Sequence, residues 1–278
     1  MNRTTLVAPI LAATALLAAG CAGDVQQAPS SDDQTVGHIH GVGIDPADDS
    51  LYVATHHGLF HVDDSGEPTR VADRWQDAMA FTIVGPGHFL ASGHPDLRED
   101  LPPHLGLIES TDAGESWRPL ALQGEADFHV LEPAGDVLYA YDATTGRLLR
   151  TEDRATFEEV LTGPLISVAA TDSGAVFATT GEGRVVSIDP ATGRTRPLGG
   201  PVTVHLDTTA DGTLVGIGPD GVVRLSDNAG STWQEAGSIG AQPAAFTITD
   251  RGWYAATEDT VLRSGDAGRT WDLVLEGS

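Results

Sequence analysis

Short apolar runs separated by turn residues dominate the chain from about residue 37 onward. The runs are rich in Val, Ile, Leu, Thr and Phe, and Gly, Asp, Asn or Pro residues stand between them. No long segment of this region has the 3.6-residue hydrophobic period of an amphipathic helix. The pattern therefore predicts many short β-strands joined by tight turns.

The runs recur in groups of three. The first runs of the groups cover residues 38–46, 80–87, 127–135, 166–174, 204–212 and 244–252. The second runs cover residues 51–57, 89–95, 137–142, 176–181, 214–218 and 253–258. The third runs follow in sequences such as GLFHV, RLLRT and VVRLS. We expect six units of roughly forty residues, each forming one four-stranded antiparallel sheet.

A second repeat follows three of the third runs, in STDAGESW (110–117), LSDNAGSTW (225–233) and RSGDAGRTW (263–271), with a worn copy in RTEDRATF (150–157). An Asp side chain can accept hydrogen bonds from the backbone of a tight turn, Gly permits a positive φ, and Trp is large enough to anchor the turn on a neighbouring unit. We predict a structural role for nine of these residues: Asp112, Gly114, Trp117, Asp227, Gly230, Trp233, Asp266, Gly268 and Trp271.

These motifs resemble the Asp-box, or BNR repeat, of sialidase-type β-propellers. The chain as a whole is similar to exported bacterial Asp-box propeller lipoproteins, often labelled sialidase-like or glycosyl-hydrolase-like, and more distantly to photosystem II assembly factors and sortilin-type propellers. The resemblance implies an all-β, six-bladed β-propeller over residues 37–278. The arginines and the Tyr nucleophile that sialidases use find no match in this sequence, so sialidase activity is not expected.

The N-terminal region differs from the rest of the chain. Residues 1–20 combine Arg3 with an apolar run rich in Leu and Ala, and they are followed by Cys21, the only cysteine. This arrangement is typical of a secretory signal peptide, and the segment LLAAGC resembles the lipidation signal of bacterial lipoproteins. Residues 21–36 are mostly polar and predict a flexible tether. We expect an exported protein, anchored by lipid on Cys21 at the outer face of the cell membrane.

The charge of the chain narrows the range of partners. It has 40 acidic residues and 15 basic ones, all of them Arg, which gives a formal net charge of −25. So acidic a protein repels phosphate backbones, and nucleic-acid binding is not expected. The absence of Lys excludes Schiff-base chemistry on a lysine. We expect a monomer.

Eight of the ten histidines lie between residues 38 and 104. In a propeller the first strand of each blade lines the central channel, and its start lies at the same rim as the end of the antiparallel second strand. His40, His129 and His205 start first strands in alternate units. We therefore predict one histidine cluster at a channel mouth, made of His38, His40, His56, His94, His129 and His205. His61, His88 and His104 are expected at the surface.

Three interpretations of this cluster remain open. Imidazoles with nearby carboxylates are suited to Zn or Cu. The same mouth could instead bind a small polar ligand or a glycan, with Asp77 and Asp142 as candidate catalytic residues and Asp127 as a further carboxylate. The histidines could also be purely structural. As a further possibility for the whole protein, the propeller could serve as an assembly platform whose acidic surface binds a protein partner. The insertion at 91–106 could form a wall or lid over the mouth, and a solvated loop is an equally compatible interpretation.

Overall fold

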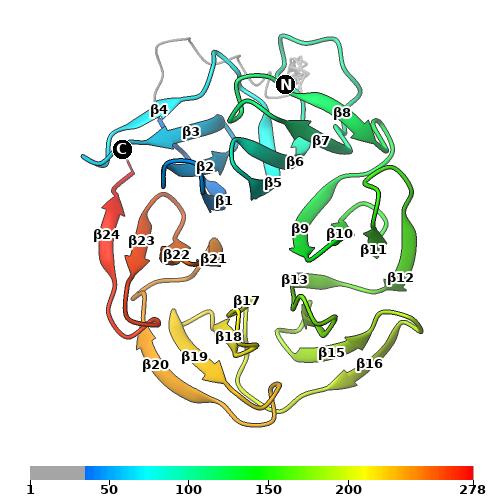
Figure 1. Cartoon of the computed structure of the whole chain (residues 1–278), viewed down its shortest axis with the longest axis vertical. Coiled ribbons are helices and arrows are strands. Elements are labelled where there is room, and N and C mark those ends of the chain that lie inside the picture. Colours follow the sequence, from blue (N-terminus) through cyan, green and yellow to red (C-terminus); the bar gives the residue numbers. More distant parts are fainter. Residues whose placement is uncertain (1–34, 278) are drawn as a thin grey trace, which may run out of the picture.

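The apolar runs form twenty-four strands in the computed structural model, which describes residues 35–277. They make six four-stranded sheets, and in every sheet the strands lie in chain order and pair antiparallel. Figure 1 shows these sheets as six blades around a central axis. The predicted six-bladed, all-β propeller is confirmed.

The strand bounds are as follows. Blade 1 contains β1 (Ile39–Ile44), β2 (Leu51–Thr55), β3 (Gly58–Val62) and β4 (Pro68–Arg70). Blade 2 contains β5 (Asp77–Gly85), β6 (His88–His94), β7 (Leu107–Ser110) and β8 (Arg118–Ala121). Blade 3 contains β9 (Phe128–Ala134), β10 (Val137–Asp142), β11 (Arg147–Thr151) and β12 (Glu158–Thr162).

The second half of the ring repeats the pattern. Blade 4 contains β13 (Leu165–Ala170), β14 (Val176–Thr180), β15 (Val185–Asp189) and β16 (Arg194–Pro197). Blade 5 contains β17 (His205–Thr208), β18 (Leu214–Ile217), β19 (Val222–Ser226) and β20 (Gln234–Ser238). Blade 6 contains β21 (Ala245–Thr249), β22 (Gly252–Ala256), β23 (Val261–Ser264) and β24 (Asp272–Leu275).

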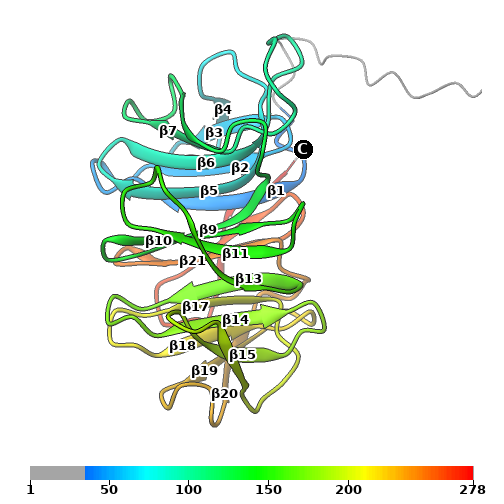
Figure 2. The same ribbon diagram turned by 90° about the vertical axis from the view of Figure 1, so that its right-hand side faces the viewer.

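Burial changes from the middle of each blade to its rim. All five residues of β2 are buried, whereas all four residues of β16 are exposed. The second strand lies between two neighbouring blades and is covered on both faces, but the fourth strand lies at the outer edge of the ring. Seen edge-on, the strands run across the thickness of the disc, so loops occupy its two faces (Figure 2).

The ring closes by side-chain packing, because blades 1 and 6 are each built from one continuous segment. Ile39 and Phe60 of blade 1 share a buried core with Ala256 and Leu275 of blade 6, and these blades lie side by side in Figure 1. The Ile39 N–H also donates to the Glu258 carbonyl at 2.9 Å.

Two predictions concern the N-terminal region. Val36, the last residue assigned to the tether, is only 1% exposed. It belongs to the core that blades 1 and 6 share, here called the closure core, so the predicted boundary between tether and propeller was wrong by at least one residue. The predicted signal peptide at 1–20 and the lipidation site Cys21 lie outside the described residues. Within residues 35–277 the structure has no helix of the length and apolar character that crossing a membrane requires.

The turns at 110–117, 225–233 and 263–271, here called the box turns, share one hydrogen-bond pattern. In the first, Asp112 Oδ1 accepts from the Ser116 N–H at 2.9 Å, and the Gly114 N–H donates to Ser110 Oγ at 2.8 Å. Gly114 has φ +90°, and a Cβ there would lie 2.5 Å from Leu59 of blade 1. Glycine is therefore required by both the turn and the blade contact.

The second box turn corrects one prediction. Asn228, and not the predicted Asp227, takes the position equivalent to Asp112, since Asn228 Oδ1 accepts from the Thr232 N–H at 2.9 Å. In the third, Asp266 Oδ1 accepts from the Thr270 N–H at 2.9 Å. Each box tryptophan packs against a core that includes residues of the preceding blade. These tryptophans are Trp117, Trp233 and Trp271, and the second and third turns contain Gly230 and Gly268 at the position of Gly114.

Candidate functional site

The innermost strands β1, β5, β9, β13, β17 and β21 surround a central channel with a cavity volume of about 690 Å³. Its lining includes His40, His129 and His205, which lie at or near the starts of β1, β9 and β17. The three imidazoles from alternate blades thus face one cavity. They do not form one cluster, because their immediate partners differ.

The first cluster at the mouth consists of His40, His56 and Asp77, and we call it site A. His40 lies at a bulge in the pairing of β1 with β2, His56 directly follows β2, and Asp77 is the first residue of β5 in the next blade. One nitrogen or oxygen from each side chain lies within 4.8 Å of the other two. The strand ends of two blades therefore bring together three metal-ligating groups.

The distances within site A are short. His40 Nε2 lies 3.3 Å from His56 Nδ1 and 3.9 Å from Asp77 Oδ1. His56 Nδ1 lies 2.8 Å from the same Asp77 oxygen, a hydrogen-bond distance. In a tetrahedral zinc site with bonds of about 2.0–2.1 Å, neighbouring ligand atoms are about 3.3 Å apart. Site A is close to that spacing.

The protonation of His40 also favours metal binding. Burial and the neighbouring His56 lower the pKa of His40 to about 4, although Asp77 acts in the opposite direction. His40 is therefore neutral at pH 7, and a neutral imidazole has a lone pair for a metal ion. His38 is exposed and lies outside the three-residue group, with its ring centroid 4.9 Å from that of His40 and 5.6 Å from that of His56.

A second cluster, site B, consists of His94, His104 and Asp127. His94 ends β6, His104 lies in the connection between β6 and β7, and Asp127 directly precedes β9 of blade 3. His94 Nε2 is 3.7 Å from Asp127 Oδ2. His104 was expected at the surface, and the structure corrects this: its Nδ1 is buried, and its ring centroid lies 5.7 Å from that of His94.

Asp77 links the two sites. The pairing of β5 with β6 places Asp77 directly opposite His94, and Asp77 Oδ2 lies 3.2 Å from His94 Nδ1. The strands approach closely at this point, since a Cβ on Gly93 would lie 2.0 Å from the Asp77 carbonyl oxygen. Asp77 therefore contacts site A with one carboxylate oxygen and site B with the other.

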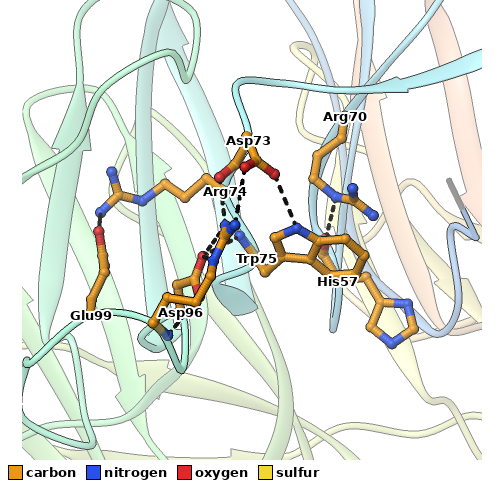
Figure 3. Close-up of polar contacts among 8 residues, drawn as sticks. His57, Arg70, Asp73, Arg74, Trp75, Asp96 and Glu99 are labelled. Atoms are coloured by element: carbon orange, nitrogen blue, oxygen red, sulfur yellow. Dashed lines mark hydrogen bonds and ion pairs between the residues drawn. The ribbon is translucent and has the colours of Figure 1, made fainter. Parts of the chain in front are cut away.

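The connection between β6 and β7 is fixed by a polar network (Figure 3). Asp96 accepts from the Trp75 N–H at 3.0 Å and from the Arg98 N–H at 2.9 Å, and Arg98 also bonds Asp73 at 3.0 Å. Burial acts against ionisation of Asp96, but the hydrogen bonds from Arg98 and Trp75 outweigh it and lower its pKa to about 2. The insertion is thus tied to the segment that immediately precedes Asp77.

His129 and Asp127 form a pair beside site B. His129 Nε2 lies 3.1 Å from Asp127 Oδ2. Burial acts against ionisation of Asp127, but the hydrogen bond with His129 and the nearby His94 outweigh it and lower the pKa of this carboxyl group. Asp127 is therefore ionised near neutral pH, as a metal ligand must be.

His205 lies apart from both sites. Burial lowers its pKa to about 4, and a contact with the Ala244 backbone opposes this effect. Its strand also carries Asp207, which is close enough to Glu132 of blade 3 to raise the pKa of that carboxyl group. This half-buried carboxyl pair was not predicted, because sequence alone does not show that β9 and β17, which flank β13 in the ring, bring these two side chains within range.

Asp142, the second predicted catalytic candidate, does not join the mouth. It is fully buried and its oxygens accept from the Asp127 N–H, the Thr144 N–H and the Thr145 hydroxyl. Asp142 therefore fixes the turn between β10 and β11 and the position of Asp127, because its carboxylate is already occupied by these partners.

Solved structures with the same architecture include proteins of different functions. The structure titled "YCF48 bound to D1 peptide" is 19% identical, with 86% of this chain and 82% of that chain covered and a TM-score of 0.55. Virginiamycin B lyase from Staphylococcus aureus is 13% identical, with coverage of 87% and 85% and a TM-score of 0.59. A gluconolactonase from Xanthomonas campestris is 10% identical, with coverage of 86% and 86% and a TM-score of 0.63.

Sequence comparison agrees with the fold. The search of curated proteins found no match. A family model described as "Outer membrane protein assembly factor BamB" matches residues 108–211 and 133–262, which together span more than half of the chain. The chain therefore belongs to the β-propeller family that this model describes.

Proposed function

We propose that this protein is an exported, lipid-anchored β-propeller that binds a transition-metal ion, Zn or Cu, at the mouth of its channel. The observation that carries the proposal is site A, in which ligand atoms of His40, His56 and Asp77 lie within 4.8 Å of one another. Two imidazoles and one carboxylate are a common donor set for such ions, and three protein ligands leave a coordination position open.

The metal proposal predicts a measurable loss on substitution of His40. Protein purified without a His-tag is titrated with Zn²⁺ and with Cu²⁺ by calorimetry, and its metal content is measured by mass spectrometry. We expect His40→Ala to weaken metal binding at site A by at least tenfold, because the ion would then be held by two protein ligands in place of three. His61→Ala is the matched control, since His61 lies in β3 away from both sites. A wild-type protein with no affinity for either ion would overturn the proposal.

Export and anchoring are supported by the sequence signals described above. If lipid on Cys21 anchors the protein, Cys21→Ser should move it from the membrane fraction to the soluble fraction of its host. Labelling with a radioactive fatty acid provides the direct readout. A wild-type protein that takes up no label would refute the anchor and leave the metal proposal intact.

The similar structures do not favour a particular reaction. A lyase and a gluconolactonase share this fold, as does a propeller bound to a peptide, so the fold suits both catalysis and partner binding. Glycan hydrolysis by Asp77 and Asp142 is less favoured, because the Asp142 carboxylate is buried and accepts hydrogen bonds within the β10–β11 turn. The side chains at the mouth support metal binding more directly than either alternative.

A further inference from the structure

Site B contains two buried polar atoms that no protein group satisfies. His104 Nδ1 and Asp127 Oδ1 are both buried and have no hydrogen-bond partner among the described residues. A buried nitrogen or carboxylate oxygen without a partner is unfavourable, because it has given up its hydrogen bonds to water and gained none within the protein. Two such atoms in one three-residue group indicate that something absent from the protein itself completes the site.

We propose that the mouth holds two metal ions, the second bound at site B by His94, His104 and Asp127. This inference rests on the proposed function and extends it from one ion to two. The donor set repeats that of site A: two imidazoles and one carboxylate whose ligand atoms lie within 4.8 Å. A cation held by His104 Nδ1 and Asp127 Oδ1 would also give these two unpartnered atoms a partner.

The partners of His94 show which of its nitrogens takes the ion. Its Nδ1 lies 3.2 Å from Asp77 Oδ2, whereas its Nε2 faces Asp127 at 3.7 Å. Histidines that bind metals usually donate the other ring N–H to a carboxylate, which orients the ring and makes the free nitrogen more basic. Asp77 supplies this carboxylate, so His94 presents Nε2 to site B.

The same geometry explains why one ion cannot serve both sites. The two nitrogens of an imidazole point away from each other, so an ion on His94 Nε2 lies on the far side of the ring from Asp77. Asp77 Oδ1 is already directed at His40 and His56. Asp77 is thus a ligand in site A and a positioning residue for site B, and it couples occupancy of the two.

The loop network supports the second site. His104 is brought to site B by the connection between β6 and β7, and Asp96 of this connection accepts a hydrogen bond from the Trp75 N–H (Figure 3). A loop carrying four charged side chains at 96–100 would otherwise be expected to extend into solvent. Delivery of His104 as a metal ligand to site B would explain why this loop is held in place.

The test is a count of metal ions per chain. Zn²⁺ is added in excess to tag-free protein at neutral pH, weakly held ions are removed by gel filtration, and bound zinc is measured by mass spectrometry. We expect two ions for the wild type, one for His104→Ala, one for His40→Ala, none for the double variant, and two for the control His61→Ala. Circular dichroism and thermal melts exclude variants that fail to fold, and His104→Gln replaces His104→Ala if the latter unfolds.

The outcomes separate the two proposals. One ion in the wild type that is lost in His40→Ala but retained in His104→Ala overturns site B and keeps the proposed function. One ion that is lost in both variants overturns the two-ion inference, because all the ligands would then share one metal. One ion lost only in His104→Ala supports site B and rejects site A. No bound zinc in the wild type overturns both.

Discussion

Replacing Glu132 by Gln should stabilise the protein at neutral and alkaline pH. Glu132 of β9 accepts the Ala170 N–H at 2.9 Å across the blade boundary, and Asp207 of β17 accepts the Ile248 N–H at 2.7 Å. Burial raises the pKa of both groups, and repulsion by Asp207 raises that of Glu132 further. The pKa of Asp207 is raised from 3.8 to about 7.

The sign follows from proton linkage. Above about pH 4 the unfolded chain has lost these protons while the folded channel retains them, so stability falls as pH rises, for Asp207 up to about pH 7. For Asp207, the rise of the pKa from 3.8 to about 7 corresponds to at most about 4 kcal/mol. Water in the channel screens part of this, and Glu132→Gln would remove only one charge of the pair, so we expect a gain of about 1–3 kcal/mol at pH 8.

The assay is urea unfolding of metal-free protein, followed by tryptophan fluorescence at several pH values from 4.5 to 8. Glu132→Gln retains a side-chain oxygen that can accept from the Ala170 N–H, so the two proteins should have similar stability at the acidic end and diverge as pH rises. Glu159→Gln, at an exposed position of β12, controls for the loss of one negative charge from a chain of net charge −25. A variant that is less stable at pH 8, or a difference that does not change with pH, would refute the reasoning.

Three further predictions concern other parts of the molecule. His205→Gln should reduce the loss of stability between pH 6.5 and 4 by at most about 3 kcal/mol, since the unfolded chain binds a proton there that the half-buried imidazole does not. Urea unfolding at the two pH values measures this, and an unchanged pH dependence would contradict it. Asn228→Ala should destabilise the fold by about 1 kcal/mol through loss of the Thr232 contacts, whereas Asn228→Asp, which retains the acceptor, should be nearly neutral in the same assay. Leu275→Ala should destabilise the fold by about 2–5 kcal/mol, because this side chain is 1% exposed in the closure core. The control Leu97→Ala, at a side chain 69% exposed, should have almost no effect, and equal melting temperatures for the two variants would exclude closure by packing.

Much of the ring could be predicted from local sequence. The expected limits of the strands now labelled β3, β10, β11 and β19 match the structure residue for residue. Alternating burial and turn residues are properties of neighbouring positions, so they can be read without knowledge of the fold. The strand β5 begins three residues earlier than expected, at Asp77, because its pairing with β6 extends to His94.

The candidate site could be predicted only in part. Placing strand starts and strand ends at one rim was enough to select His40, His56, His94 and Asp77. It could not show that His104 returns to the mouth, because the path of its loop depends on the contacts of Asp96 and Arg98 with the segment before β5. It also could not distinguish Asn228 from Asp227, since that choice depends on the register of one turn.

The sequence by itself determined that the chain folds into six similar sheets, because strand period and turn chemistry act over a few residues. Tertiary structure alone decided which side chains meet. Packing between adjacent blades places Asp127 beside His94, and the packing of blades 3 and 5 on the two sides of blade 4 places Glu132 within range of Asp207. Such contacts join positions far apart in the chain, and their geometry depends on how whole sheets pack.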